Sequence, residues 1–109
     1  MSLAELLVHE VTLQRPVLTK DASGGSSRSF ADVDTYTCSI QPLSYKEQAR
    51  WGARQLFVTH VLYFDADRGI RRGDRLYQAA TGKYYVVLSY QDQAGQAELY
   101  AAYAREQLS

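Results

Sequence analysis

Residues 54–92 read RQLFVTHVLYFDADRGIRRGDRLYQAATGKYYVVLSYQD, and this stretch decides the fold. It holds three apolar, aromatic-rich runs separated by two turn-like segments. In the first run, residues 55–65, apolar side chains occupy both sets of alternating positions: Leu56, Val58, Leu62 and Phe64, then Phe57, Val61 and Tyr63. Because strand side chains alternate between two faces, this pattern is typical of a strand that is buried on both sides. The first run is therefore predicted to be a strand with two covered faces.

The second and third runs, residues 74–79 and 83–90, are predicted to form a hairpin. Between them, Ala-Thr-Gly-Lys at 80–83 supplies a tight turn in which Gly82 can take a positive φ. In the third run one face is formed by Tyr84, Val86, Leu88 and Tyr90, and the other by Tyr85 and Val87. We expect the three runs to be consecutive antiparallel strands that pair in chain order.

Two further strands are predicted ahead of this stretch. Residues 9–18 alternate, and Pro16 places them at a sheet edge or ends their regular pairing, because proline cannot donate to a ladder. Residues 30–43 alternate through Tyr36, Cys38 and Ile40 until Pro42 stops the ladder. Cys38 is the only cysteine, which excludes an internal disulfide and a cysteine-based zinc site. A buried core thiol is the favoured interpretation.

A short helix is predicted over residues 44–52. Ser44 stands at the N-cap position with Glu47 three residues later, which is a capping box, and Gly52 is placed to end the helix. A helix of about two turns is unstable alone, so we expect it to dock on the sheet. Its i, i+4 row of Lys46, Arg50 and Arg54 is expected to stay exposed.

The last predicted strand covers residues 97–105, after a loop at 91–96. Its alanine-rich sequence suits a helix by propensity, but a short connection favours a strand beside residues 83–90. The fold class is thus mainly β, within one domain of 109 residues. We predict a small antiparallel β-barrel of about six strands with one short helix and a long flexible hairpin loop.

The hairpin loop is residues 19–29, which are rich in serine and glycine and match no phosphate-binding loop. Two interpretations remain open: a mobile hairpin tip, or a segment that orders on contact with a partner. The candidate partner-contact residues in it are Thr19, Lys20, Asp21, Ser23, Gly24, Gly25, Ser26, Ser27 and Arg28.

The most charged segment is residues 65–75, DADRGIRRGDR. Its arginines either pair with Asp65, Asp67 and Asp74 in a solvated turn or serve an interface. Together with the helix row, the candidate residues for a DNA channel or a subunit interface are Lys46, Arg50, Arg54, Arg68, Arg71 and Arg72.

The net charge, the two histidines and the length of the apolar runs argue against several functions. Twelve basic and twelve acidic residues give zero formal net charge, which argues against strong DNA binding by the chain alone. Neither His9 nor His60 has a companion carboxylate or nucleophile at motif spacing, so we expect no enzyme, no cofactor and no metal site. No apolar run approaches the roughly 20 residues of a membrane span. The default expectation is a soluble protein of the cytoplasm without membrane contact.

The order of these segments resembles a known family over residues 9–106. The residues that carry the resemblance are the 20–24 loop KDASG, YTCSIQPL at 36–43, THV at 59–61, IRRGDRL at 70–76 and GKYYVV at 82–87. In this order they resemble the bacteriophage head–tail joining proteins, also called stopper, head-closure or head–tail adaptor proteins, of siphophages and prophages.

The resemblance implies a structural virion protein that forms a homo-oligomeric ring. Such a ring lies beneath the portal and its head-completion adaptor, binds a tail terminator or tail-completion protein, and helps to retain packaged double-stranded DNA by non-specific contact. The expected location is the head–tail interface of the virion, and the bacterial cytoplasm during assembly. The alternative is a small barrel of the OB or SH3 type that binds single-stranded nucleic acid or a protein partner.

Overall fold

The computed structural model describes residues 8–20, 22, 24–54, 56–92 and 99–107. The elements, in chain order, are β1 (His9–Lys20), β2 (Ser26–Pro42), α2 (Tyr45–Gly52), β3 (His60–Phe64), β4 (Arg75–Gln78), β5 (Lys83–Asp92) and β6 (Tyr100–Gln107). The predicted loop at 91–96 therefore starts later, because β5 continues to Asp92. Residues 93–96 of this loop lie outside the described residues, and so does the N-terminal lead-in expected at residues 1–8, except for Val8.

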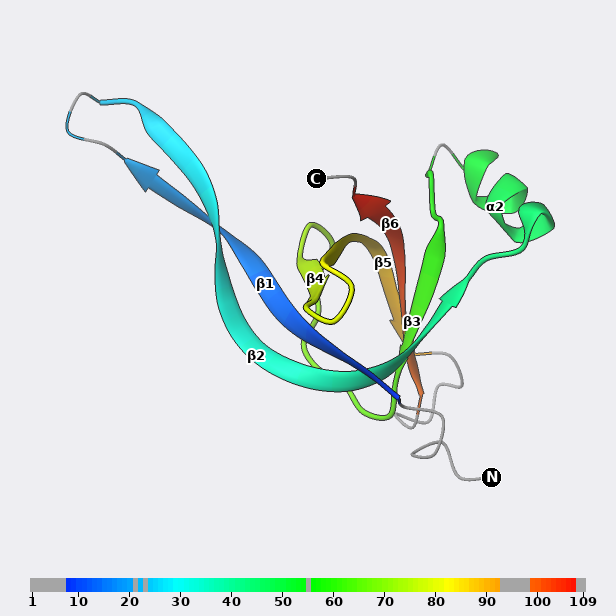
Figure 1. The fold of residues 1–109 in the computed structure, drawn as a ribbon. Helices are drawn as coiled ribbons and strands as arrows, with labels where there is room; N and C mark the ends of the chain where they lie inside the picture. The colour runs from blue at the N-terminus through cyan, green and yellow to red at the C-terminus, as the bar shows by residue number, and fades with distance from the viewer. Residues whose placement is uncertain (1–7, 21, 23, 55, 93–98, 108–109) are drawn as a thin grey trace.

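The strands form one closed antiparallel barrel in the order β1-β2-β3-β6-β5-β4 (Figure 1). This confirms the predicted fold class. The strand at the end of the chain is also confirmed against its helical alternative, since β6 pairs with both β3 and β5. Its small residues suit this position, because Ala101, Ala102 and Ala104 are all fully buried.

The predicted pairing of the first run with the second is wrong. β3 pairs with β2 and β6, whereas β4 pairs with β1 and β5. In the six-strand order β3 and β4 lie opposite each other, so residues 65–74 cross one end of the barrel instead of forming a tight turn. Ile70, only 5% exposed, anchors this crossing in the core. The hairpin of β4 and β5 is confirmed, with Gly82 at φ +71°.

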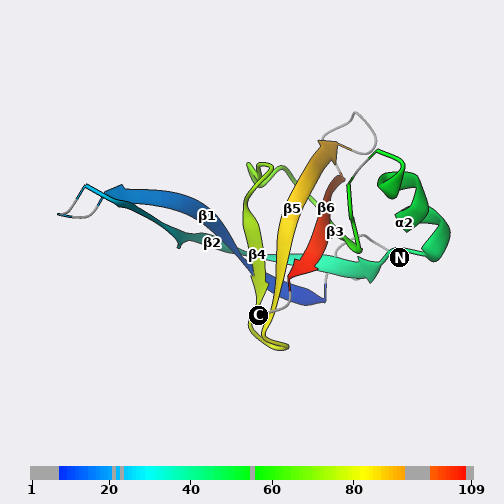
Figure 2. The ribbon, with the colours of Figure 1, turned by 90° about the horizontal axis from the view of Figure 1, so that it is seen from above.

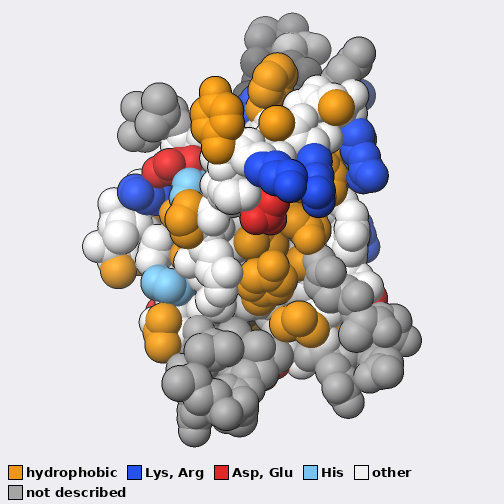
Figure 3. Space-filling view, turned by 90° about the vertical axis from the view of Figure 1, so that its right-hand side faces the viewer, with side chains coloured by type: hydrophobic (Ala, Val, Ile, Leu, Met, Phe, Trp, Pro, Cys, Tyr) orange, Lys and Arg blue, Asp and Glu red, His pale blue; other side chains and the backbone are white. Residues whose placement is uncertain are grey.

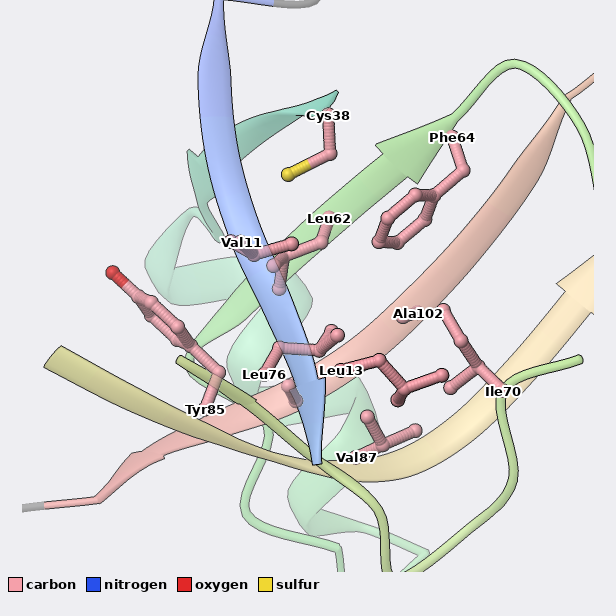
Figure 4. Close-up of a cluster of buried hydrophobic side chains, with 11 residues drawn as sticks. Val11, Leu13, Cys38, Leu62, Phe64, Ile70, Leu76, Tyr85, Val87 and Ala102 are labelled. Atoms are coloured by element: carbon pink, nitrogen blue, oxygen red, sulfur yellow. The ribbon is translucent and has the colours of Figure 1, made fainter. Parts of the chain in front are cut away.

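The barrel interior is filled by side chains from every strand (Figure 4). It contains Val11, Leu13, Cys38, Leu62, Phe64, Ile70, Leu76, Tyr85, Val87, Ala102 and Ala104. Cys38 is fully buried as predicted, and burial raises the pKa of its thiol to about 12. A bulge at Leu88 breaks the predicted face of β5: Leu88 packs outside the barrel, whereas Tyr90 packs against the interior.

A second apolar cluster lies outside the barrel, between its wall and α2. Leu43, Val58, Val61 and Ala101 form it, and Trp51 covers it with its ring 4.7 Å from that of Tyr103. β3 is therefore buried on both faces, as predicted. The regular strand begins at His60, however, because residues 56–59 form only isolated backbone bonds such as Thr59 N–H to the Ala104 carbonyl. Phe57, expected on a covered face, is 71% exposed, and Gln55 lies outside the described residues.

The capping box of α2 is confirmed. The Ser44 hydroxyl oxygen accepts from the Glu47 backbone N–H at 3.2 Å and the hydroxyl donates to the Glu47 carboxylate at 3.0 Å. These bonds satisfy an N-terminal amide that the helix itself leaves unpaired. No residue of α2 is fully buried, so the helix lies on the barrel surface with one side facing solvent.

β1 and β2 continue past the barrel as a two-stranded arm, which gives the molecule extents of 55 × 31 × 29 Å (Figures 1 and 2). The predicted boundaries of the 19–29 loop are therefore wrong. Thr19 pairs with Ser27 and Lys20 with Ser26, so the connection is confined to residues 21–25. Backbone pairing does not require an alternating apolar pattern, so the two strands continue into residues that alternation alone did not identify.

Candidate interaction surfaces

The arm has long outer edges. Of the described residues, β1 pairs with β4 only from Thr12 to Gln14, and β2 pairs with β3 only from Ser39 to Pro42. In the arm, the described residues of β1 and β2 pair only with each other. The arm exposes Val17 (41%) and Leu18 (70%). Exposed strand edges with apolar side chains are typical of sites where another chain docks.

The predicted partner-contact residues are spread over the end of this arm. Thr19 and Lys20 end β1, while Ser26, Ser27 and Arg28 begin β2. Gly24, at φ +86°, and Gly25 belong to the connection, and Asp21 and Ser23 lie outside the described residues. The candidate contact segment is thus the tip of a paired hairpin.

An arginine fixes the base of the arm. The Arg75 guanidinium carbon lies 3.9 Å from the ring centre of Phe30 and 4.3 Å from that of Tyr84. Its Nε also donates to the side-chain oxygen of Gln14 at 2.8 Å, and the Gln14 amide donates to Asp32 at 2.9 Å. This chain of contacts joins β4 and β5 of the barrel to both strands of the arm. The arm base is therefore held in one orientation.

A partly buried ion pair ties the crossing segment, residues 65–74, to β1 at the same place. Asp74 is 2% exposed, and its carboxylate accepts from Arg15 Nε at 3.2 Å and from Arg15 Nη2 at 3.0 Å. It also accepts from the Arg71 backbone N–H at 2.9 Å, and Arg15 donates to the Gly69 carbonyl. Hydrogen bonding to Asp74 raises the pKa of Arg15, which stays charged. The partner of Asp74 is thus Arg15 from β1, and not one of the nearby arginines.

The three arginines predicted in this segment have different surroundings. Arg68 forms an ion pair with Asp65 at 2.9 Å and lies over Tyr36 at 4.8 Å from the ring centre. Its backbone N–H donates to the Tyr90 hydroxyl, which in turn donates to Asp67. Burial raises the pKa of Tyr90 to about 12, so this hydroxyl keeps its proton.

Arg71 and Arg72 are exposed, and within the described part of the chain no side-chain ion pair or hydrogen bond holds either guanidinium. Arg68 is therefore largely structural, whereas the other two are available for a partner.

The helix carries the second group of predicted cations. Lys46, Arg50 and Arg54 are all exposed, and Arg54 lies 5.6 Å from the ring centre of Trp51. α2 covers β3 and β6, and β4 is opposite β3 in the barrel. The six predicted cations therefore form two separate groups, one on α2 and one on the crossing segment.

A shallow apolar groove runs beside the helix cations. Tyr45, Gln48, Ala49, Gly52 and Phe57 line it, and its volume is about 260 Å³. Tyr45 is 91% exposed, so both rims of the groove are aromatic side chains in contact with solvent. Figure 3 shows orange hydrophobic and blue cationic side chains gathered together on the upper part of this face.

The histidines have structural surroundings. His60 Nδ1 is 2.9 Å from the Thr59 hydroxyl, its ring packs edge-on against Tyr85, and burial lowers its pKa. His9 Nδ1 accepts from the Ile40 backbone N–H at 3.2 Å. No set of three or more His, Cys, Asp or Glu side chains among the described residues is arranged to hold a metal ion. Across the same residues, no helix combines the length and apolar character needed to cross a bilayer.

The open strand edges of the arm and the exposed apolar side chains are features of a protein that docks with other chains. The sequence matches the family model of the phage head completion protein over residues 3–106. The chain belongs to that family, and its role is that of a structural protein of the phage head, which assembles with other head or tail proteins.

Two solved structures share the fold. Protein SF1141 from Shigella flexneri 2a matches with a TM-score of 0.75 and 20% identity, over 92% of each chain. A chain in the virion of a native gene transfer agent particle matches with a TM-score of 0.56 and 16% identity, over 92% of this chain and 94% of that one. No curated protein sequence matches the chain.

Sequence reasoning missed three features of these surfaces. Arg15 was not assigned any role, and Arg75 was considered only as a member of the charged segment, because the residues that they contact are up to 61 positions away. The groove was missed because Phe57 has the alternation of a strand residue but precedes the strand. The third feature is the exposed bulge at Asp32, Val33 and Asp34, whose sequence reads as a continuous strand.

Proposed function

We propose that this chain is the subunit of a ring that joins the DNA-filled head to the tail and helps to retain the packaged DNA. The observation that carries the proposal is the placement of its contact features: the arm and α2 project from opposite sides of the barrel (Figures 1 and 2). A subunit with two different contact faces on opposite sides forms head-to-tail contacts, which close into a ring when the rotation allows it. Membership of the head completion family supports a location of this ring in the phage head.

The barrel and the arm have separate tasks in this proposal. The barrel supplies a rigid wall, whose interior is filled with side chains and whose arm base is fixed by Arg75. The arm reaches past the barrel with open strand edges, which suits contact with a neighbouring subunit, a portal-side adaptor or a tail-completion protein. Virion assembly takes place in the bacterial cytoplasm.

DNA contact is assigned to the exposed arginines of the crossing segment. Arg71 and Arg72 are candidates for the channel side, and Arg68 supports them through its contacts with Asp65 and Tyr36. With zero net charge, one subunit offers too little charge for tight binding in solution. A ring repeats the pair of arginines around one opening and so concentrates positive charge where DNA passes.

The alternative as a nucleic-acid module has less support. Base stacking needs exposed aromatic faces, but most such rings here are already in contact with a neighbour. Tyr84 lies between Arg75 and Tyr77, Tyr36 is covered by Arg68, and Tyr90 stacks on Tyr100.

The test is deletion of the gene from the phage or prophage that encodes it, followed by complementation. We expect the deletion to yield heads and tails that are not joined, with reduced DNA retention, and the wild-type chain to restore infectious particles. The variant Arg71→Gln/Arg72→Gln should fold normally and restore fewer DNA-filled particles. Its matched control, Lys83→Gln/Arg105→Gln, removes two exposed cations outside the arm, the crossing segment and α2, and should complement fully. Normal particle yield from the deletion would exclude the joining role.

A further inference from the structure

The groove beside α2 has the properties of a docking site for an acidic segment that carries one apolar side chain. Its lining includes the exposed rings of Tyr45 and Phe57, at 91% and 71% exposure, together with Ala49. Lys46 and Arg50 lie on the same short helix, and within the described residues neither cation has an ion-pair partner. Apolar walls beside unpaired cations favour a ligand with the complementary pattern.

The same chain presents that pattern on the arm base. Leu13 pairs with Asp34 and Gln14 with Asp32, so Val33 is an extra residue that no residue of β1 opposes. This is a β-bulge, which aims the inserted side chain away from the ladder. Val33 is 47% exposed and lies between two exposed carboxylates. Gln14 holds Asp32 while it also accepts from Arg75, so the bulge is fixed against the barrel.

The groove and the bulge of one molecule cannot meet. Nine residue steps of β2 separate Val33 from Pro42, which is up to about 30 Å of strand. β2 runs from the arm on one side of the barrel towards α2 on the other (Figures 1 and 2). A contact between them must therefore join two copies.

We propose that the bulge at Asp32, Val33 and Asp34 of one subunit docks in the α2 groove of the next subunit. Val33 enters between Tyr45 and Phe57, and the two carboxylates face Lys46 and Arg50. The contact is heterologous, so each copy uses one half and offers the other, which is the arrangement that closes a ring. This inference rests on the proposed ring and identifies the surfaces that form it.

The charges of the molecule favour a second copy as the occupant. β1 ends near the arm tip in Lys20, which would face the cations of α2 unfavourably, whereas the arm base carries two carboxylates. Zero net charge removes long-range repulsion between copies.

Cysteine cross-linking between differently tagged copies tests the contact. One copy carries Val33→Cys and the other Ala49→Cys, and Cys38 remains unreactive because it is fully buried. Oxidised glutathione is added to the purified mixture at high concentration and to particles assembled from both copies. We expect disulfide-linked pairs that contain one copy of each tag. A single chain with both cysteines should give a ladder of oligomers.

The matched control replaces Val33→Cys by Ala79→Cys, an exposed position in the turn between β4 and β5. We expect the 33–49 pair to cross-link at least about tenfold more than the 79–49 pair, the ratio given by about 1.4 kcal/mol of docking preference. Equal yields in both the solution and the particles would overturn the proposal. Cross-links from position 49 only to a different protein of the particle would also overturn it.

Charge reversal gives an independent readout. Asp32→Lys/Asp34→Lys should abolish the cross-link, and Lys46→Glu/Arg50→Glu in the partner copy should restore it. Restoration by the second reversal excludes a folding defect as the cause of the loss. Restored cross-linking together with normal particles from a gene deletion would retain the contact and exclude the joining role. If the chain is required for joining but cross-linking stays at the control level, the joining role would be retained and the contact between bulge and groove would be excluded.

Discussion

The barrel and the arm are built from the same two strands, yet their side chains have opposite surroundings. In the first half of β1, Val11 and Leu13 are 1% and 0% exposed, whereas Val17 and Leu18 in the second half are 41% and 70% exposed. The change coincides with the bulge opposite Leu13 and Gln14, where pairing with β4 also ends. An alternating sequence thus specifies a strand in both halves of β1. Its apolar side chains are buried only in the half where further strands close the barrel around them.

The two regions also differ in what they contribute: the barrel supplies stability, and the arm supplies surfaces for contact with other chains. Apolar burial is the main favourable contribution to folding, and here it is concentrated in the barrel and under α2. The arm beyond the barrel has backbone pairing but little buried apolar surface, so changes there should affect assembly more than folding.

The largest effect is expected in the barrel interior. Leu62 is fully buried, so Leu62→Ala should lower the free energy of unfolding by about 2–5 kcal/mol through lost burial and a cavity. The matched substitution on the arm, Leu18→Ala, should change it by no more than about 0.5 kcal/mol. Urea denaturation of both variants measures the contrast, and similar losses would show that the arm belongs to the same packed unit.

The junction between the two regions should rank second. Arg15→Ala leaves the Asp74 carboxylate buried without its cation, and we expect a loss of about 2–3 kcal/mol. The control Arg72→Ala removes an exposed arginine from the same neighbourhood and should be near neutral. Equal effects of the two substitutions on the urea midpoint would mean that the ion pair does not support the fold.

A smaller loss is expected at the start of α2. Ser44→Ala removes the acceptor of the Glu47 amide and should cost about 1 kcal/mol. Ser29→Ala on the arm removes a hydroxyl from an exposed strand position and serves as the control. An unchanged melting temperature for Ser44→Ala would show that the cap does not stabilise the helix.

His60 should give the chain a modest pH dependence. Burial lowers its pKa in the folded state below the ordinary value of 6.5, so the unfolded state binds the proton more tightly. The stabilising contribution is present above pH 6.5 and is lost as the pH falls towards the folded-state pKa. Urea midpoints of the wild type and His60→Gln should therefore converge when measured at pH values below 6.5. A constant difference across this range would contradict the assignment.

The smallest effect on stability is expected at the tip of the arm. Replacing residues 21–25 with Asn-Gly, which suits a two-residue hairpin turn, keeps the pairing of Lys20 with Ser26. The melting temperature should stay nearly unchanged while the yield of joined particles falls, because the tip is a candidate partner contact. A large drop in melting temperature would show that the tip is packed against the barrel.

The elements that could be predicted from sequence are those with local signals. Alternation identified the strands, Ser44 and Glu47 identified the helix start, and Gly82 identified the β4–β5 turn. The strands that pair with β3 could not be derived in this way. The pattern of residues 55–65 indicates that both faces are buried, but it does not indicate which strands form hydrogen bonds with its two edges. The short connection predicted β6 beside β5, but the pairing of β6 with β3 leaves no local trace in either sequence.

The candidate site was predictable only as a set of residue types. The six cations were identified from their spacing, but their division into a helix group and a crossing-segment group follows from the barrel closure. That closure brings Arg15 to Asp74 and leaves Arg71 and Arg72 exposed. Long-range pairing therefore decides which arginines are structural and which are available to a partner.

The most direct test of the proposed joining role is an electron cryo-microscopy reconstruction of the neck of the particle that carries this chain. The account predicts a ring of these barrels between head and tail, with the arm base of each subunit against α2 of its neighbour. Arg71 and Arg72 should face the central channel. A resolved neck between a DNA-filled head and its tail that contains no density for this barrel would contradict the claim.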